Sequence, residues 1–264
     1  MHEVLESAVS ALEAYGGFGN AKREVIETAV ASAVATIASR WEHERPVPPP
    51  VIWRKTLETT WKLSVEALTY SLDPLPGQKS WTEIPFGVPD KKARQDLPWD
   101  ESCQVEIPNS GIIIRGYIDR LDLSGDLRHA RVIDYKTGRL NNKMADVVVK
   151  GGSELQRCLY ALAVRTLVGH EVEVEASLLY LRAPEGEQAL FPLNDVNAAL
   201  DLLVAAIASA RMNVENGLAL PGIDAGDDYN DFALALPANP GYLQRKRLSA
   251  DQNMGDAIKI WEAD

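Results

Sequence analysis

Two charged side chains occupy alternate positions at the end of the apolar run 132–136, an aspartate at 134 and a lysine at 136. Because successive side chains of a β-strand point to opposite faces, Asp134 and Lys136 would share one face. The preceding β-prone run ends in residues 116–122 and delivers a second carboxylate, Asp119, at the far end of a strand that we expect to pair with the first. Two carboxylates beside one lysine can bind a hard divalent cation such as Mg²⁺, which prefers a few carboxylate oxygens and keeps several waters. Such an ion activates water for attack on a phosphodiester, and a lysine can position that water.

An Asp-x-Lys pair by itself more often marks a polar strand face with a cross-strand ion pair. Two further observations favour a site. Asp134 directly follows the apolar pair Val132-Ile133, where a surface strand has little reason to place a charge. Gln156 and Tyr160 are four residues apart and therefore share one helix face, where an amide and a ring could hold a nucleotide or its phosphate.

Three motifs follow one another in the chain: Gly-Tyr-Ile-Asp-Arg at 116–120, Val-Ile-Asp-Tyr-Lys-Thr-Gly at 132–138 and Gln-x-x-x-Tyr at 156–160. Together they resemble the PD-(D/E)XK nucleases, specifically the exonuclease domains of the RecB and AddB type. The resemblance spans about residues 2–160. It implies that Asp119 and Asp134 hold the metal, that Lys136 is catalytic, and that Gln156 and Tyr160 shape the DNA-binding site.

Three more residues have two interpretations each. The family places a metal-ligating histidine on an N-terminal helix, and residues 1–6 resemble the latter half of that motif without its glycine, so His2 is either a ligand or a frayed terminal residue. Glu6, one turn further along the same face, is an alternative ligand. Arg120 is either a DNA-phosphate contact or a structural ion-pair partner.

Many relatives of the AddB type also carry four cysteines that bind an iron–sulfur cluster. This chain has two cysteines, Cys103 and Cys158, which are too few for a four-thiolate site. We therefore expect no iron–sulfur cluster, and we expect Cys158 to be a core residue of its helix.

The spacing of apolar residues and the positions of glycine and proline predict an α/β fold, with a mixed central β-sheet flanked by helices (a restriction-endonuclease-like core) and an N-terminal helical portion. The expected helices span 3–15, 21–40, 52–70, 153–167 with Ser153 as its cap, and 194–212. The expected strands of the sheet lie near 104–107, 112–123, 130–136 and 172–181. We expect a single nuclease domain over 1–264, divided into a helical portion (1–75), a catalytic core (80–215) and an irregular tail (216–264) held by packing of Tyr229, Phe232 and Tyr242.

The overall charge limits how the chain can bind nucleic acid. Its 264 residues include 27 basic and 38 acidic side chains, which gives a net charge of −11 and opposes non-specific adhesion to phosphates. We therefore expect basic groups to cluster at the mouth of the active site. No apolar run approaches the roughly 20 residues of a membrane span, and the N-terminus does not resemble a signal peptide, so we expect a cytoplasmic protein without a membrane partner.

These observations predict a Mg²⁺- or Mn²⁺-dependent deoxyribonuclease, acting as an exonuclease on single- or double-stranded DNA ends in repair or recombination. A helicase subunit is its candidate partner. The alternative is a catalytically inactive DNA-binding or scaffolding module of a helicase–nuclease complex. The intact set of two acids and one lysine argues against that alternative, because a decayed site usually loses one of them. RNA is a third possible substrate.

Overall fold

The computed structural model describes residues 1–70, 72–87, 97–100, 102–140, 142–184, 186–218, 234–235, 237–239, 241–253, 258 and 260. The tail residues Tyr229 and Phe232 lie outside these ranges. Within them, no helix combines the length and the apolar character that crossing a membrane requires.

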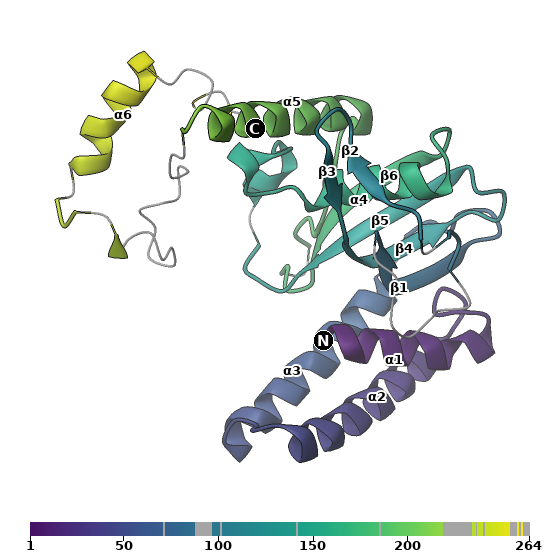
Figure 1. The fold of residues 1–264 in the computed structure, drawn as a ribbon. Helices are drawn as coiled ribbons and strands as arrows, with labels where there is room; N and C mark the ends of the chain where they lie inside the picture. The colour runs from purple at the N-terminus through teal and green to yellow at the C-terminus, as the bar shows by residue number, and fades with distance from the viewer. Residues whose placement is uncertain are drawn as a thin grey trace.

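A five-stranded mixed sheet forms the centre of the molecule (Figure 1). Its strands are arranged in the order β1-β4-β5-β6-β7. Neighbouring strands are antiparallel except for β5 and β6, which are parallel and are connected through a helix. The bounds are β1 (Lys79–Phe86), β4 (Gly116–Leu123), β5 (His129–Lys136), β6 (Glu173–Tyr180) and β7 (Leu190–Pro192). The predicted α/β fold with a mixed central sheet is confirmed.

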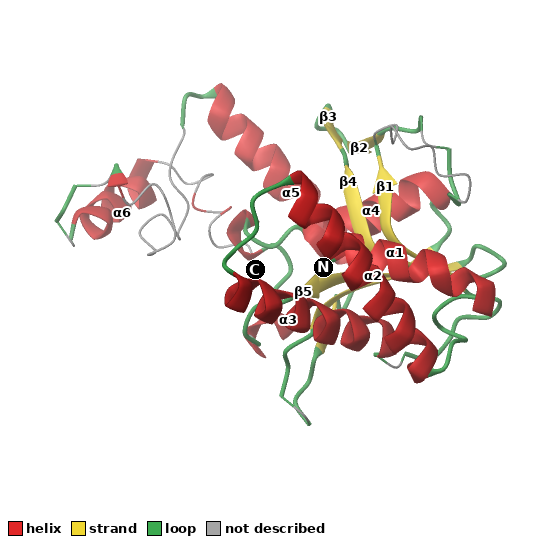
Figure 2. Cartoon of the chain, turned by 90° about the horizontal axis from the view of Figure 1, so that it is seen from below, coloured by secondary structure: helices red, strands yellow, loops and turns green. Residues whose placement is uncertain are grey.

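Helices cover both faces of this sheet (Figures 1 and 2). One face packs against the N-terminal helices α1 (His2–Leu12), α2 (Arg23–Glu44) and α3 (Pro50–Thr69). The other packs against α4 (Gln156–Val168) and α5 (Val196–Glu215). In Figure 2, which views the molecule from below, α1, α2 and α3 lie in front of the strands.

Strand β5 shows how the sequence assigns side chains to the two layers. Ile133 and Tyr135 belong to the core under the N-terminal helices, whereas Ala130 and Val132 belong to the core under α4 and α5. This alternation is the two-residue period of a strand. It places Asp134 and Lys136 on the α4 side of the sheet, in line with the core residues Ala130 and Val132.

The run 112–123, predicted as one strand, is interrupted at Arg115. Its first part, β3 (Ile112–Ile114), pairs with β2 (Val105–Ile107) in a separate two-stranded sheet. The prediction that 104–107 belongs to the central sheet is therefore wrong. Gly87 fixes the approach of this small sheet, because its φ is +70° and a Cβ there would lie 2.3 Å from the carbonyl oxygen of Ile114.

The helix expected from 153 begins three residues later, at Gln156. Ser153 does not cap it, because its hydroxyl donates to the carbonyl of Lys150 in the preceding 3₁₀ turn Lys150–Gly152. Further 3₁₀ turns span Glu13–Tyr15 and Asn142–Ala145. The tail that was predicted to be irregular contains helix α6 (Tyr242–Asn253).

Candidate active site

The site lies where β4 and β5 separate. The last paired residues of this ladder are Arg120 and Ile133, so Asp119 and Asp134 are the next residue on each strand. Beyond the ladder the backbone N–H of Tyr135 donates to Asp119 Oδ2 at 2.9 Å. The two carboxylates predicted from the sequence thus meet at one end of the β4–β5 ladder, and both are buried.

A histidine and a second acid join Asp119 at this point. His2, at the start of α1, lies with its Nδ1 2.6 Å from Glu83 Oε1 and 3.9 Å from Asp119 Oδ1. One potential ligand atom from each of these three residues lies within 4.8 Å of the other two. Asp134 is not a member of this group, and Glu6 is exposed and is not a member either.

The backbone of β1 directs Glu83 toward its neighbours. Glu83 lies between the cross-strand pairs Thr82–Arg120 and Ile84–Ile118, which places it opposite Asp119. Its φ is +51°, in the left-handed region that residues other than glycine rarely adopt. Such backbone strain is retained where the surrounding structure imposes it, often at functional sites.

The electrostatics of this group favour a positive ligand. Burial raises the pKa of Asp119 to about 7, and the charges of Asp134 and Glu83 add to the increase, although the hydrogen bond from Tyr135 opposes it. The hydrogen bond with Glu83 raises the pKa of His2. Burial and nearby like charges both raise the pKa of a carboxyl, because each disfavours its ionised form.

Lys136 lies on the α4 side, next to Asp134. Its Nζ is 2.7 Å from Asp134 Oδ2 and 3.7 Å from Glu154 Oε2, and it donates a hydrogen bond to Gln156 Oε1. Burial alone would lower the pKa of Lys136, but the hydrogen bond and charge of Asp134, together with Glu154, raise it above the usual value. Lys136 therefore stays an ammonium ion.

Helix α4 brings Gln156 and Tyr160 to the same place. Gln156 is exposed in the first turn, and Tyr160 is buried one turn later and forms a side-chain hydrogen bond with it. Burial raises the pKa of Tyr160, and the charges of Asp119 and Asp134 raise it further. Gln156 thus contacts Lys136, and Tyr160 lies near the two carboxylates. Both residues are on one face of α4, as their spacing predicted.

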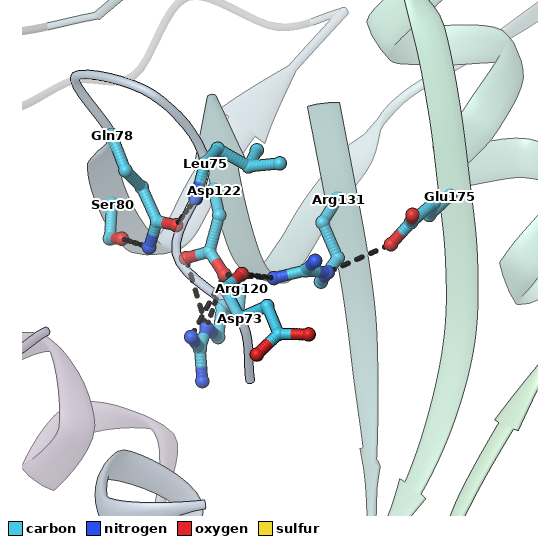
Figure 3. Close-up of polar contacts among 8 residues, drawn as sticks. All are labelled: Asp73, Leu75, Gln78, Ser80, Arg120, Asp122, Arg131 and Glu175. Atoms are coloured by element: carbon cyan, nitrogen blue, oxygen red, sulfur yellow. Dashed lines mark hydrogen bonds and ion pairs between the residues drawn. The ribbon is translucent and has the colours of Figure 1, made fainter. Parts of the chain in front are cut away.

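Arg120 points to the opposite face and is only 4% exposed (Figure 3). It donates to both carboxylate oxygens of the fully buried Asp122. Its guanidinium also lies over the ring of Phe18, 4.7 Å from the centroid. These contacts correct the prediction that Arg120 binds DNA, because a buried, paired guanidinium cannot reach a phosphate; the structural alternative is the one that the contacts support.

The ion pair of Arg120 continues into a network across the sheet. Arg131 lies 4.0 Å from Asp122 Oδ2, donates to Glu175 at 2.9 Å, and donates to the carbonyl of Asp73 at 3.1 Å. The segment that follows α3 is thereby tied to β5 and β6 (Figure 3). We assign this network a structural role.

The two cysteines are far from equivalent. Cys158 is completely buried among the core residues of α4 and α5, as expected, whereas Cys103 is exposed. Burial raises the pKa of the Cys158 thiol to about 11, so it remains protonated and unreactive at neutral pH.

Sequence reasoning missed Glu83 and Glu154. The signal for Glu83 was available: it is the one charged residue of the apolar segment 81–86, the same pattern that pointed to Asp134. Pro85 obscured the strand, because proline is unusual inside a sheet and is accommodated here on β1, which is an edge strand. Glu154 carried no such signal, because it precedes its helix in a polar loop.

Comparison with known proteins shows the family of this chain. The model of the PD-(D/E)XK nuclease superfamily matches residues 1–222. The chain belongs to this superfamily. An ATP-dependent helicase/nuclease subunit from Desulfitobacterium hafniense is 28% identical over 143 residues, which are 54% of this chain and 10% of the relative. An ATP-dependent helicase/deoxyribonuclease subunit from Symbiobacterium thermophilum is 37% identical over 125 residues, 44% of this chain and 9% of the relative. The matches cover about a tenth of these curated relatives.

Nucleases of this superfamily use divalent metals, and the residues present fit such an ion. One imidazole nitrogen and two carboxylates converge within 4.8 Å, and they supply the oxygen-rich donor set that hard cations prefer. Asp119 contributes a buried carboxylate. Among the described residues, His2 is the one cationic side chain that contacts it. His2, Glu83 and Asp119 would hold the ion, with Asp134 beside them.

Proposed function

We propose that this chain is a Mg²⁺- or Mn²⁺-dependent deoxyribonuclease that hydrolyses phosphodiester bonds at DNA ends. The observation that carries the proposal is the convergence of His2, Glu83 and Asp119 next to Asp134 and Lys136, at the end of the β4–β5 ladder. A cation site supplies the activated water and the Lewis acid for phosphodiester hydrolysis, and a charged lysine beside it can stabilise the charge that develops.

Each side chain has a role in this proposal. A bound divalent cation would lower the pKa of a water molecule and polarise a phosphoryl oxygen. Lys136, held as an ammonium ion by Asp134, orients the attacking oxygen and neutralises charge that develops on the phosphoryl group. Gln156 fixes the ammonium through its side-chain oxygen and, with Tyr160, presents polar groups to the DNA strand.

A groove that shares Tyr180 with the surroundings of Lys136 has one more basic than acidic side chain in its lining. It has a volume of about 1280 Å³ and lies between α2, α3 and the β6–β7 connection. Its lining includes four basic side chains, Arg54, Lys55, Lys62 and Arg182, and three acidic ones, in a chain of net charge −11. Tyr180 also lines the groove and lies close enough to Lys136 for the ammonium charge to oppose the effect of burial on its pKa. A strand lying in this groove would therefore approach Lys136.

The similarity to helicase/nuclease subunits suggests where such an activity is used. We propose that the chain acts as an exonuclease in DNA repair or recombination, and that its partners are DNA and a helicase subunit. This part of the proposal rests on the named relatives and on the three sequence motifs.

A cleavage assay tests the proposal. The purified chain is incubated with end-labelled single-stranded, double-stranded and closed-circular DNA, in Mg²⁺, Mn²⁺ or EDTA. We expect cleavage of the linear substrates only with a divalent cation, and a loss of at least about 100-fold in the Lys136→Met variant. The Lys22→Met variant, which removes an exposed lysine far from the motif residues in sequence, should retain full activity.

Three results would contradict parts of the proposal. Cleavage that persists in EDTA would show that the cation is not required. Metal-dependent DNA binding without any cleavage by the unmodified chain would instead support the inactive scaffolding module. Cleavage of RNA but not of DNA would correct the substrate.

A further inference from the structure

Glu154 is a second buried acid beside Lys136 that the proposed mechanism does not use. It lies between the 3₁₀ turn Lys150–Gly152 and helix α4, and it is 6% exposed. Its Oε2 is 3.7 Å from Lys136 Nζ. Its Oε1 is buried and has no hydrogen-bond partner among the described residues. Burying a carboxylate is costly unless a cation compensates it, so its position beside the lysine requires an explanation.

Arg157, three residues further along the chain, is a second cation whose charge interacts with that of Glu154. This arginine is 1% exposed and donates to the carbonyls of Val147 at 2.6 Å and Phe191 at 3.2 Å. Burial lowers its pKa, and the charge of Glu154 opposes that effect. The charge of Glu154 therefore interacts with two cations, Arg157 in the core and Lys136 at the candidate active site.

Asp134 cannot serve Lys136 and a divalent cation equally well. The oxygen nearest to the ammonium, Oδ2, is 2.7 Å from Nζ, and Asp134 also lies near enough to Asp119 for their charges to interact. A cation held at Asp119 would draw on the charge of Asp134 and weaken its attraction for the ammonium. Glu154 is not a member of the cation-binding group, so its charge remains available to Lys136.

We propose that Glu154 is a positioning residue: it is the counter-ion that holds the Lys136 ammonium on the α4 side when a divalent cation occupies the site. This inference rests on the proposed function. Without Glu154, Asp134 is the remaining carboxylate of the ion pairs that Lys136 makes. The ammonium then competes with the cation for that carboxylate, and it also loses the position from which it acts on the substrate.

The test measures Mn²⁺ binding by electron paramagnetic resonance, together with single-turnover DNA cleavage, in the full chain. Glu154→Gln keeps the shape of the side chain and removes its charge. We expect Mn²⁺ affinity to fall about tenfold, as it does when a group outside the ligand sphere is lost. The maximal cleavage rate should also fall, with the KM for DNA unchanged. The matched control Glu171→Gln removes the same charge from an exposed turn before β6, outside the groove, and should change neither quantity.

A double-mutant cycle with Lys136→Met separates the proposed role from direct attraction of the cation. If Glu154 acts through Lys136, then Glu154→Gln has no further effect on Mn²⁺ affinity once the ammonium is absent. An equal loss in both backgrounds would show that Glu154 attracts the cation directly and would overturn the proposal. If Glu154→Gln alone does not fold, the double variant is compared with Lys136→Met only, and a lower Mn²⁺ affinity of the double variant would overturn the proposal.

Glu154→Asp, which retains the charge, should recover most of the lost affinity and rate, whereas a loss equal to that of Glu154→Gln would show that packing is responsible.

Mn²⁺ binding by the unmodified chain distinguishes failure of the proposed function from failure of the inference about Glu154. If it binds no Mn²⁺, the proposed function itself fails. If it binds Mn²⁺ and Glu154→Gln binds equally well, only the present inference fails.

Discussion

Asp119 illustrates the cost of a buried carboxylate in this site. It is 7% exposed, and burial together with nearby carboxylates raises its pKa to about 7, whereas the usual value is 3.8. The folded chain therefore holds this proton more tightly than the unfolded chain does. The free energy of unfolding contributed by this group decreases as the pH rises from about 4 to about 7, and it is constant above that range.

Asp119→Asn should therefore stabilise the metal-free protein at pH 8. Asparagine carries no charge and keeps an oxygen that can accept from Tyr135, so it removes a cost of at most about 4 kcal/mol. Urea unfolding in EDTA at pH 8 and pH 4 measures the difference, which should nearly vanish at the lower pH. A variant less stable than the unmodified chain at pH 8 would contradict the assigned pKa.

Glu83 should be required for cation binding although no motif pointed to it. Glu83→Gln removes one of the three converging ligands, and we expect Mn²⁺ affinity to fall by more than about tenfold. Calorimetric titration measures the affinity. Glu6→Gln is the matched control, because Glu6 is exposed on helix α1, which also carries His2, and lies outside the cation-binding group. Equal Mn²⁺ affinities of the two variants would exclude Glu83 as a ligand.

Among the elements, strand β4 presents a site residue on one face and a buried structural ion pair on the other. Asp119 faces the site, whereas the neighbouring Arg120 and, two residues on, Asp122 form a buried ion pair under the N-terminal helices. A single-residue shift of this strand would exchange these faces. The network of Arg120, Asp122 and Arg131 thus helps to fix the register that presents Asp119.

Asp122→Asn should be strongly destabilising. It leaves the guanidinium of Arg120 buried without its counter-ion, which costs about 3–5 kcal/mol in comparable cases. Glu175→Gln tests the exposed end of the same network, where the carboxylate is 62% exposed, and should cost less than about 1 kcal/mol. Chemical denaturation of both variants checks this order, and equal losses would contradict it.

The sequence predicted those elements whose periodicity was uninterrupted. Strand β5 and its charged end were predicted because apolar residues precede Asp134 and Lys136. Strand β1 was not recognised as a unit because of Pro85, which only an edge strand tolerates. The break at Arg115 was missed because both sides are β-prone, and only the pairing of β3 with β2 distinguishes them. The positive φ of Glu83 is a tertiary effect that no local pattern encodes.

At the scale of the whole molecule, the site is assembled from segments that are distant in the sequence. Helix α1 provides His2, β1 provides Glu83, β4 and β5 provide Asp119, Asp134 and Lys136, and α4 provides Gln156. The cores on the two faces of the sheet fix these elements independently. Cation binding therefore depends on the folded arrangement, because the unfolded chain would separate the three ligands.

The position of a bound Mn²⁺ ion would show directly whether His2, Glu83 and Asp119 bind a divalent cation. Crystals grown with Mn²⁺ and measured at a wavelength where manganese scatters anomalously would locate the ion without assumptions about activity. We expect an anomalous peak among His2, Glu83 and Asp119, adjacent to Asp134. A structure in which these side chains diverge, or in which Mn²⁺ binds only elsewhere, would contradict this expectation.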